Sequence, residues 1–155
     1  MLIIGIGNAW RRDDGAGPAV AERLALRPGL QVLVLPGEGT EVMSAWRKDS
    51  RVVVVDAMRS GAAAGTVRRF DALEEGLPVG AFPSLSHRFG LAEAVEMARI
   101  LGQLPRMLEV WGIEAADLGE GPGLSPEVEA AVNRVAAAIN QLLTAAEDYP
   151  PPSSS

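Results

Sequence analysis

The chain has 155 residues, 48% of them hydrophobic, which suits one domain with a hydrophobic core and leaves no room for a second. Its 14 basic and 20 acidic residues give a net charge of -6, which argues against a nucleic-acid partner, because such proteins usually present a basic surface. Cysteine is absent, so disulfides, thiolate ligands and cysteine nucleophiles are excluded, and oxygen and imidazole remain as metal ligands.

The first half of the chain predicts strands that alternate with helices. Residues 1–6 form a short apolar run of the kind found in buried parallel strands. A helix is expected over residues 18–26, with Gly17 as the N-cap and Pro18 at the first helical position. Residues 32–35 predict a second strand, and Thr40 is expected to open a short helix that ends near Arg47.

The central part combines the strongest strand signal with a long loop. Residues 51–56 read RVVVVD, and four consecutive valines indicate a strand buried on both faces at the centre of a sheet. A short strand is expected over residues 67–70. Residues 74–86 then form a loop whose length is unusual in a compact domain and is typical of a functional segment.

The last part predicts a helix over residues 91–101, a strand over 107–113 and a helix over 125–146. Ser125 is the expected N-cap of the final helix, with Pro126 at its first position. Residues 149–155 end in PPPSSS and are expected to be a disordered tail, so the domain should span residues 1–148.

Strands separated by helices predict a three-layer α/β/α fold, in which ligands bind beyond the carboxyl ends of the strands where the strand order reverses. If the strands at residues 1–6 and 51–56 are neighbours, the loops that carry Asp14 and Asp56 flank one crevice. His87, the only histidine, would reach it from the long loop. Two carboxylates and an imidazole outline a metal site.

Other interpretations of these motifs are weaker. The glycines of GIGN after the first strand begin a dinucleotide-binding pattern, but Trp10 replaces its third glycine and Pro36 replaces the acidic residue that should end the second strand. Asp14 could instead favour the positive end of the following helix. Ser84 and Ser86 beside His87 lack the GxSxG turn of a serine hydrolase.

The chain contains, in this order, the motifs GIGN, DDGAG, VVVVDA, SHRFGL, WGIE and LSPEVEAAV. Together they resemble the hydrogenase maturation protease family. Its members are nickel-dependent endopeptidases that trim the large subunit of [NiFe] hydrogenases. The resemblance implies a five-stranded sheet ordered 2-1-3-5-4 with strand 4 antiparallel. It also implies that Asp14, Asp56 and His87 contact the metal and carry the catalytic function. Glu114 is followed by Ala115 where the family often has proline, and the segment between Gly39 and Arg51 is short.

The implied function is endopeptidase removal of a C-terminal peptide from a [NiFe] hydrogenase large-subunit precursor after nickel insertion. Nickel would be carried by the substrate, and zinc or another divalent ion could substitute. The residues leave open whether the metal activates a water molecule or only reports that the substrate is loaded. The alternatives are a non-catalytic metal-sensing or chaperone protein, and a nucleotide- or anion-binding α/β module.

Neither an apolar run of about 18 residues nor a signal segment is found, so we expect a cytoplasmic protein without membrane association. The expected partner is the precursor, and the expected oligomeric state is a monomer or weak dimer.

Overall fold

The computed structural model describes residues 1–78, 80–82 and 89–148. Its strands are β1 (Leu2–Ile6), β2 (Gln31–Leu35), β3 (Arg51–Met58), β4 (Val67–Asp71) and β5 (Met107–Glu114). Its helices are the 3-10 helix η1 (Arg12–Gly15) and the α-helices α1 (Ala16–Leu24), α2 (Gly39–Ala45), α3 (Leu91–Ile100) and α4 (Pro126–Asp148).

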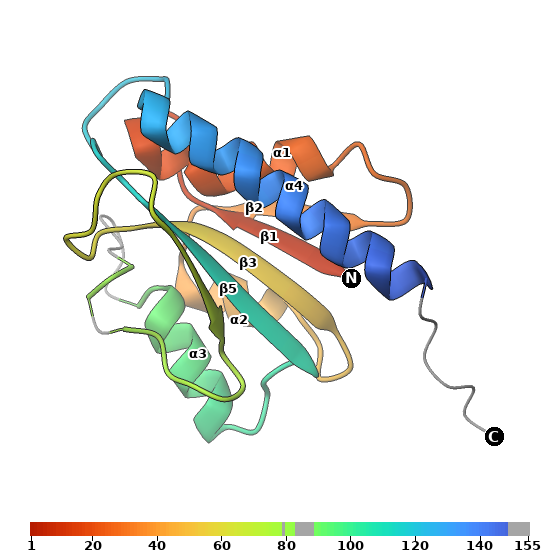
Figure 1. Cartoon of the computed structure of the whole chain (residues 1–155). Coiled ribbons are helices and arrows are strands. Elements are labelled where there is room, and N and C mark those ends of the chain that lie inside the picture. The colour runs from red at the N-terminus through yellow and green to blue at the C-terminus, as the bar shows by residue number, and fades with distance from the viewer. Residues whose placement is uncertain (79, 83–88, 149–155) are drawn as a thin grey trace.

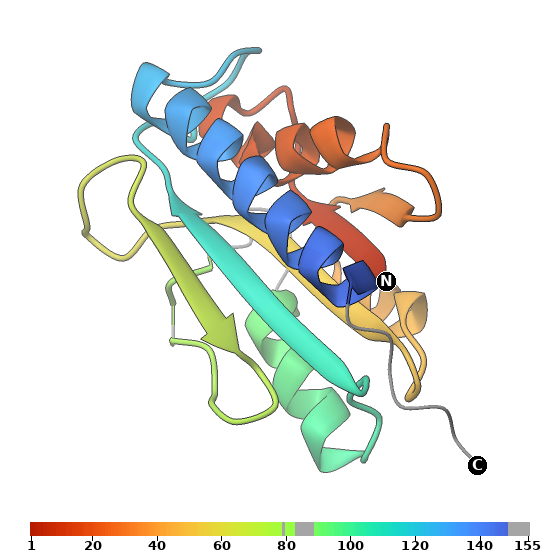
Figure 2. The same cartoon turned by 45° about the vertical axis from the view of Figure 1, so that its right-hand side comes forward.

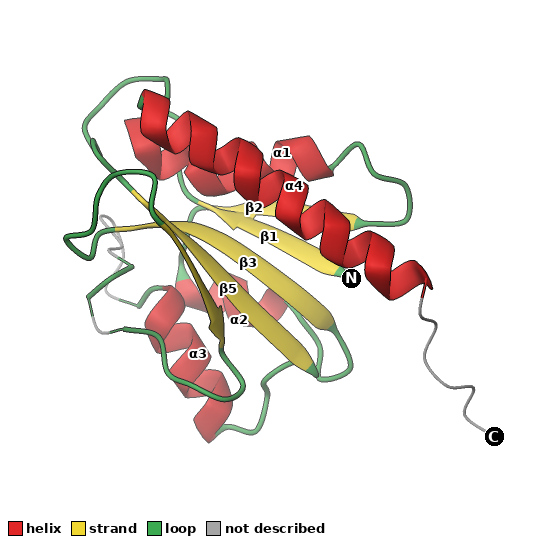
Figure 3. Ribbon diagram, viewed as in Figure 1, coloured by secondary structure: helices red, strands yellow, loops and turns green. Residues whose placement is uncertain are grey.

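The five strands form one sheet in the order β2-β1-β3-β5-β4. β1 is parallel to β2 and β3, and β3 is parallel to β5, whereas β4 is antiparallel to β5 (Figure 3). The expected strand order and the antiparallel fourth strand are therefore confirmed.

Helices cover both faces of this sheet, as Figures 1 and 2 show from two directions. α1 and α4 pack on one face, and α2 and α3 pack on the other. The run of valines in β3 serves both layers: Val52 and Val54 join the hydrophobic cluster beneath α2 and α3, and Val53 and Val55 join the cluster beneath α1 and α4. Alternating side chains of a central strand thus fill two cores.

Two predicted helix starts were wrong. α1 begins at Ala16 with Gly15 as its N-cap, rather than at Pro18 after Gly17, because η1 leads directly into it. α2 begins at Gly39, and its N-cap is Glu38, whose carboxylate accepts hydrogen bonds from the backbone N–H groups of Thr40 and Glu41. A glutamate two residues before the expected start supplies the acceptor that Thr40 was expected to provide.

Gly17 explains how closely α1 approaches the sheet. A Cβ atom at this position would overlap the carbonyl oxygens of Ile6, the last residue of β1, and of Val55 in β3. Only glycine fits here, and the contact holds the start of α1 and the preceding η1 against the carboxyl-terminal edge of the sheet. None of the helices in the described ranges is long and apolar enough to cross a membrane.

Candidate functional site

The candidate site lies at the carboxyl-terminal edge of the sheet between β1 and β3. The chain leaves β1 through α1 to one side and returns through α2 to β3 on the other, so the strand order reverses here. Asp56 of β3 is paired in register with Ile6 of β1 and is only 7% exposed. A carboxylate buried so deeply in an apolar strand needs a compensating partner.

Asp14 reaches the same edge from η1. Its Oδ2 accepts a hydrogen bond of 2.9 Å from the backbone N–H of Asn8. Gly7 allows this fold of the loop, because its φ of 144° lies in the region that favours glycine and a Cβ there would overlap the carbonyl oxygen of Asp14. The second glycine of GIGN therefore allows the backbone conformation of the loop that carries Asp14.

We call Asp14 and Asp56 the carboxylate pair. The charge of one carboxylate affects the pKa of the other. Burial raises the pKa of Asp56 well above its usual range, and the negative charge of Asp14 raises this pKa further, against the effect of the Ala57 N–H. Burial also raises the pKa of Asp14, although the Asn8 N–H and the Arg11 guanidinium act in the opposite direction. Two neighbouring anions in a partly dry site favour a shared proton or a cation.

Arg11 places a positive charge beside Asp14, where it lowers the pKa of this carboxylate. Its backbone N–H donates to the Asn8 carbonyl oxygen at 3.0 Å, and its carbonyl oxygen accepts from the Asp14 N–H at 3.1 Å. The Nε of Arg11 is buried and has no hydrogen-bond partner within the part of the chain that the structure describes. Arg11 therefore combines a charge that favours ionised Asp14 with an unused donor.

Asp13 has a different function from its neighbour. It is fully buried, and its Oδ2 accepts hydrogen bonds from the N–H groups of Ala116 (2.9 Å) and Asp117 (2.8 Å). Ser125 donates from its N–H to Oδ1 at 2.7 Å and from its hydroxyl to Oδ2 at 2.8 Å. Burial raises the pKa of Asp13, but these donors outweigh it and leave the pKa below its ordinary value. Asp13 thereby ties the loop of Asp14 to the loop between β5 and α4.

Glu114 anchors a second loop at this edge. It is only 2% exposed, and its carboxylate accepts hydrogen bonds from the N–H groups of Ser60 (2.9 Å) and Gly61 (3.1 Å) and from the Ser60 hydroxyl (2.8 Å). Neither Asp13 nor Glu114 was predicted to have a function in the site. For Glu114 the signal was available, since a carboxylate at the end of the mostly apolar strand β5 resembles Asp56 after the valines of β3.

The structure thus places Asp14 and Asp56 at one edge, with interacting charges. His87, Ser84 and Ser86 lie outside the described residues. Among the residues that are described, no group of three metal-ligating side chains is found, so the predicted three-residue metal site stays a prediction.

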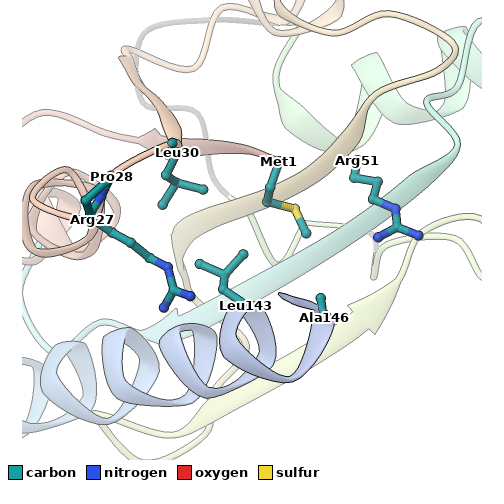
Figure 4. Close-up of a pocket in the computed structure, with 8 residues that line it drawn as sticks. Met1, Arg27, Pro28, Leu30, Arg51, Leu143 and Ala146 are labelled. Atoms are coloured by element: carbon teal, nitrogen blue, oxygen red, sulfur yellow. The ribbon is translucent and has the colours of Figure 1, made fainter. Parts of the chain in front are cut away.

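A cleft of about 220 Å³ lies between the α1–β2 connection, the start of β3 and the last turns of α4 (Figure 4). Arg27 and Leu30 from the α1–β2 connection, Arg51 from the start of β3, and Leu143 and Ala146 from α4 line it. These residues lie at the edge of the sheet where β2 and β3 begin, and the carboxylate pair lies at the edge where β1 and β3 end. The cleft is therefore separate from the candidate site.

The fold and the carboxylate pair define a three-layer α/β protein with an acidic site at the switch point of its sheet. Comparison with known proteins identifies the group within this class. The family model "Hydrogenase maturation protease" matches residues 19–142, and the chain belongs to that family.

Individual relatives agree with this assignment. The chain is 29% identical over 151 residues to the Hydrogenase 2 maturation protease of Escherichia coli K12, covering 94% of this chain and 89% of that protein. It is 29% identical over 148 residues to the hydrogenase expression/formation protein HupD of Thiocapsa roseopersicina, which covers 92% of this chain but 66% of HupD. The structure of the hydrogenase maturating endopeptidase HybD from E. coli has a TM-score of 0.71, with 23% identity and coverage of 95% of this chain and 91% of that one.

Proposed function

We propose that this protein is a nickel-dependent endopeptidase that removes a C-terminal peptide from a [NiFe] hydrogenase large-subunit precursor after nickel insertion. The single observation that supports this most strongly is the carboxylate pair, in a chain whose family is named for hydrogenase maturation. We place the reaction in the cytoplasm, and the nickel belongs to the substrate.

The chemistry of the carboxylate pair supports a divalent ion as the species that the site recognises. Asp14 and Asp56 provide anionic oxygen ligands, and the mutual repulsion that raises the pKa of Asp56 would be relieved by a cation between them. Asn8 fixes one oxygen of Asp14 through its N–H, which leaves the other oxygen for the substrate's metal. We assign His87 as a third ligand, supplied by the loop before α3.

A processing assay tests the proposal directly. Wild-type protein is incubated with nickel-loaded and nickel-free precursor, and the shortened large subunit is detected by its gel mobility. We expect cleavage of the nickel-loaded form alone, and no cleavage by Asp14→Asn or Asp56→Asn, because each substitution removes an anionic ligand and nearly preserves side-chain shape. Asp49→Asn is the matched control, since Asp49 is exposed on the turn before β3.

The same assay separates this proposal from the alternatives. Ser84→Ala and Ser86→Ala should retain activity, whereas a serine mechanism would lose it. Equal cleavage of both precursor forms, or full activity in Asp56→Asn, would refute the proposed mechanism. A wild-type protein that binds nickel-loaded precursor without cleaving it would favour the non-catalytic alternative.

The assignment of His87 has its own test. Calorimetric titration with zinc at constant pH should give weaker binding for His87→Ala and for Asp56→Asn than for wild type, because imidazole and carboxylate are both expected ligands. Asp49→Asn should leave the affinity unchanged. Wild-type affinity in His87→Ala would remove this residue from the metal site.

A further inference from the structure

Trp10 is unusual among the tryptophans of this chain. Its side chain is 71% exposed, whereas Trp46 and Trp111 are each 6% exposed. A solvated indole forgoes the large stabilisation that burying an aromatic side chain provides. Exposed tryptophans are also among the residues that most often dominate binding energies at protein interfaces.

The backbone that carries Trp10 is fixed on both sides. The Trp10 N–H donates to Asn8 Oδ1 at 2.9 Å, and the Trp10 carbonyl oxygen accepts from the Gly121 N–H at 2.8 Å. The Arg12 N–H returns a bond of 2.9 Å to the Gly121 carbonyl oxygen. Arg12 has a φ of 51°, an uncommon value for a residue other than glycine, and these bonds hold it there. The loop that carries the indole is therefore already ordered, so a ligand that binds there pays little conformational entropy for ordering it.

This loop is continuous with the carboxylate pair. Trp10 lies four residues before Asp14, and Asn8 bonds to both through its Oδ1 and its N–H. Four residues span at most about 14 Å even when fully extended. A peptide whose reacting bond lies at the carboxylate pair can therefore reach the indole with a side chain within about four residues of that bond.

Among the described residues, the two large apolar side chains that are more exposed than Trp10 lack this relation to the site. Leu26 is 89% exposed but follows α1, at the edge of the sheet where β2 begins. Ile100 is 78% exposed and is the last residue of α3, after which the chain continues to the start of β5. Trp10 thus combines exposure, a fixed backbone and adjacency to the carboxylates.

We propose that Trp10 is the anchor of a substrate-docking surface formed by Trp10, Arg12 and Gly121, which binds an apolar side chain of the precursor within about four residues of the cleaved bond. The inference rests on the proposed function for the identity of the occupant. Trp10 contributes binding and specificity and takes no part in bond cleavage. It distinguishes precursor segments by whether they place an apolar group at this distance.

Steady-state kinetics test the docking role, with nickel-loaded precursor from the same organism as substrate. We expect Trp10→Ala to lower kcat/KM about tenfold, mainly through KM, as for the loss of an interface hot spot. Trp10→Phe should retain most of kcat/KM, because an aromatic ring remains. Leu26→Ala is the matched control and should be unchanged. An unchanged kcat/KM in Trp10→Ala would overturn the proposal.

A binding measurement separates failure of this proposal from failure of the proposed function. The protein is labelled with 5-fluorotryptophan, and the ¹⁹F resonance of Trp10 is assigned by its loss in Trp10→Phe. Unlabelled nickel-loaded precursor should shift the Trp10 resonance more than those of buried Trp46 and Trp111. If the precursor is bound but not cleaved and Trp10 shifts, docking stands and the peptidase function fails. If the precursor is cleaved and the Trp10 resonance does not move, docking fails and the peptidase function stands.

Discussion

Asp56 is a buried carboxylate whose ionisation opposes folding in the absence of a cation. Its pKa is raised in the native protein by burial and by Asp14, so the native state holds the proton more tightly than the unfolded state does. The contribution of Asp56 to the free energy of unfolding should therefore fall as the pH rises from about 3.9, the usual pKa of aspartate, through the raised native pKa.

Asp56→Asn removes this ionisation and should stabilise the metal-free protein at pH 7 by on the order of 1 kcal/mol. The gain should disappear below about pH 4, where Asp56 is protonated in both states. Urea unfolding at the two pH values, with a chelator present, measures the difference. Asp49→Asn should change neither value, and a wild type more stable than Asp56→Asn at pH 7 would contradict the electrostatic explanation.

Asp13 should behave in the opposite way, because its two oxygens accept four hydrogen bonds from the loop between β5 and α4. Because the pKa of Asp13 is lowered in the native state, the ionised side chain stabilises the fold at pH values above the ordinary pKa of aspartate. This stabilisation is lost as the pH falls through the native pKa of Asp13. Asn places an NH₂ group against these donors in either orientation. We expect Asp13→Asn to lower the free energy of unfolding at pH 7 by about 2 to 3 kcal/mol, measured in urea.

The same variant should also impair precursor processing, since Asp14 follows Asp13 directly and depends on the position of this loop. Asp49→Asn again serves as the exposed control. A loss below about 0.5 kcal/mol, the usual range for surface substitutions, would show that Asp13 does not hold the two loops together.

At the level of elements, the packing of α1 against β1 and β3 depends on Gly17. Gly17→Ala should destabilise the protein by about 3 kcal/mol, because the added Cβ meets two backbone carbonyl oxygens, which yield less readily than side chains do. Glu22→Ala, at an exposed position of the same helix, should be near neutral. Urea unfolding of both variants checks this, and equal midpoints would mean that α1 can move away from the sheet without loss.

The elements that the sequence predicted well are those whose signal is local. β3 was predicted from its valines, because a strand buried on both faces is apolar throughout. α4 was predicted from the Ser125-Pro126 start and from the helical period of the apolar residues after it, because a helix buried on one side has apolar residues at that period. The placement of Asp14 and Asp56 at one edge was predicted on the condition that the strands at residues 1–6 and 51–56 are neighbours, and β1 and β3 are paired.

The missed features depend on partners distant in sequence. Asp13 and Ser125 are 112 positions apart, and Glu114 and Ser60 are 54 positions apart, so no local pattern reveals these hydrogen bonds. η1 was missed because a single 3-10 turn has no apolar period of its own. It nevertheless sets where α1 begins and where Asp14 lies.

For the whole molecule, the sheet is shared by two hydrophobic clusters, one on each face. Val54 belongs to the cluster with α2 and α3, and Val55 to the cluster with α1 and α4, yet both are adjacent residues of β3. Neither layer can lose its packing without exposing one face of the central strands. The two clusters should therefore unfold together.

Val54→Ala and Val55→Ala should each lower the free energy of unfolding by about 2 kcal/mol, because each removes buried methyl groups and leaves a cavity. In calorimetry, both should move one common transition down by roughly 4 to 8 °C, with the calorimetric enthalpy equal to the van't Hoff enthalpy. Val34→Ala, at a position of β2 that is 54% exposed, is the control and should have little effect. Two transitions, one sensitive to Val54→Ala and the other to Val55→Ala, would show that the layers fold independently and that residues 1–148 are not one cooperative domain.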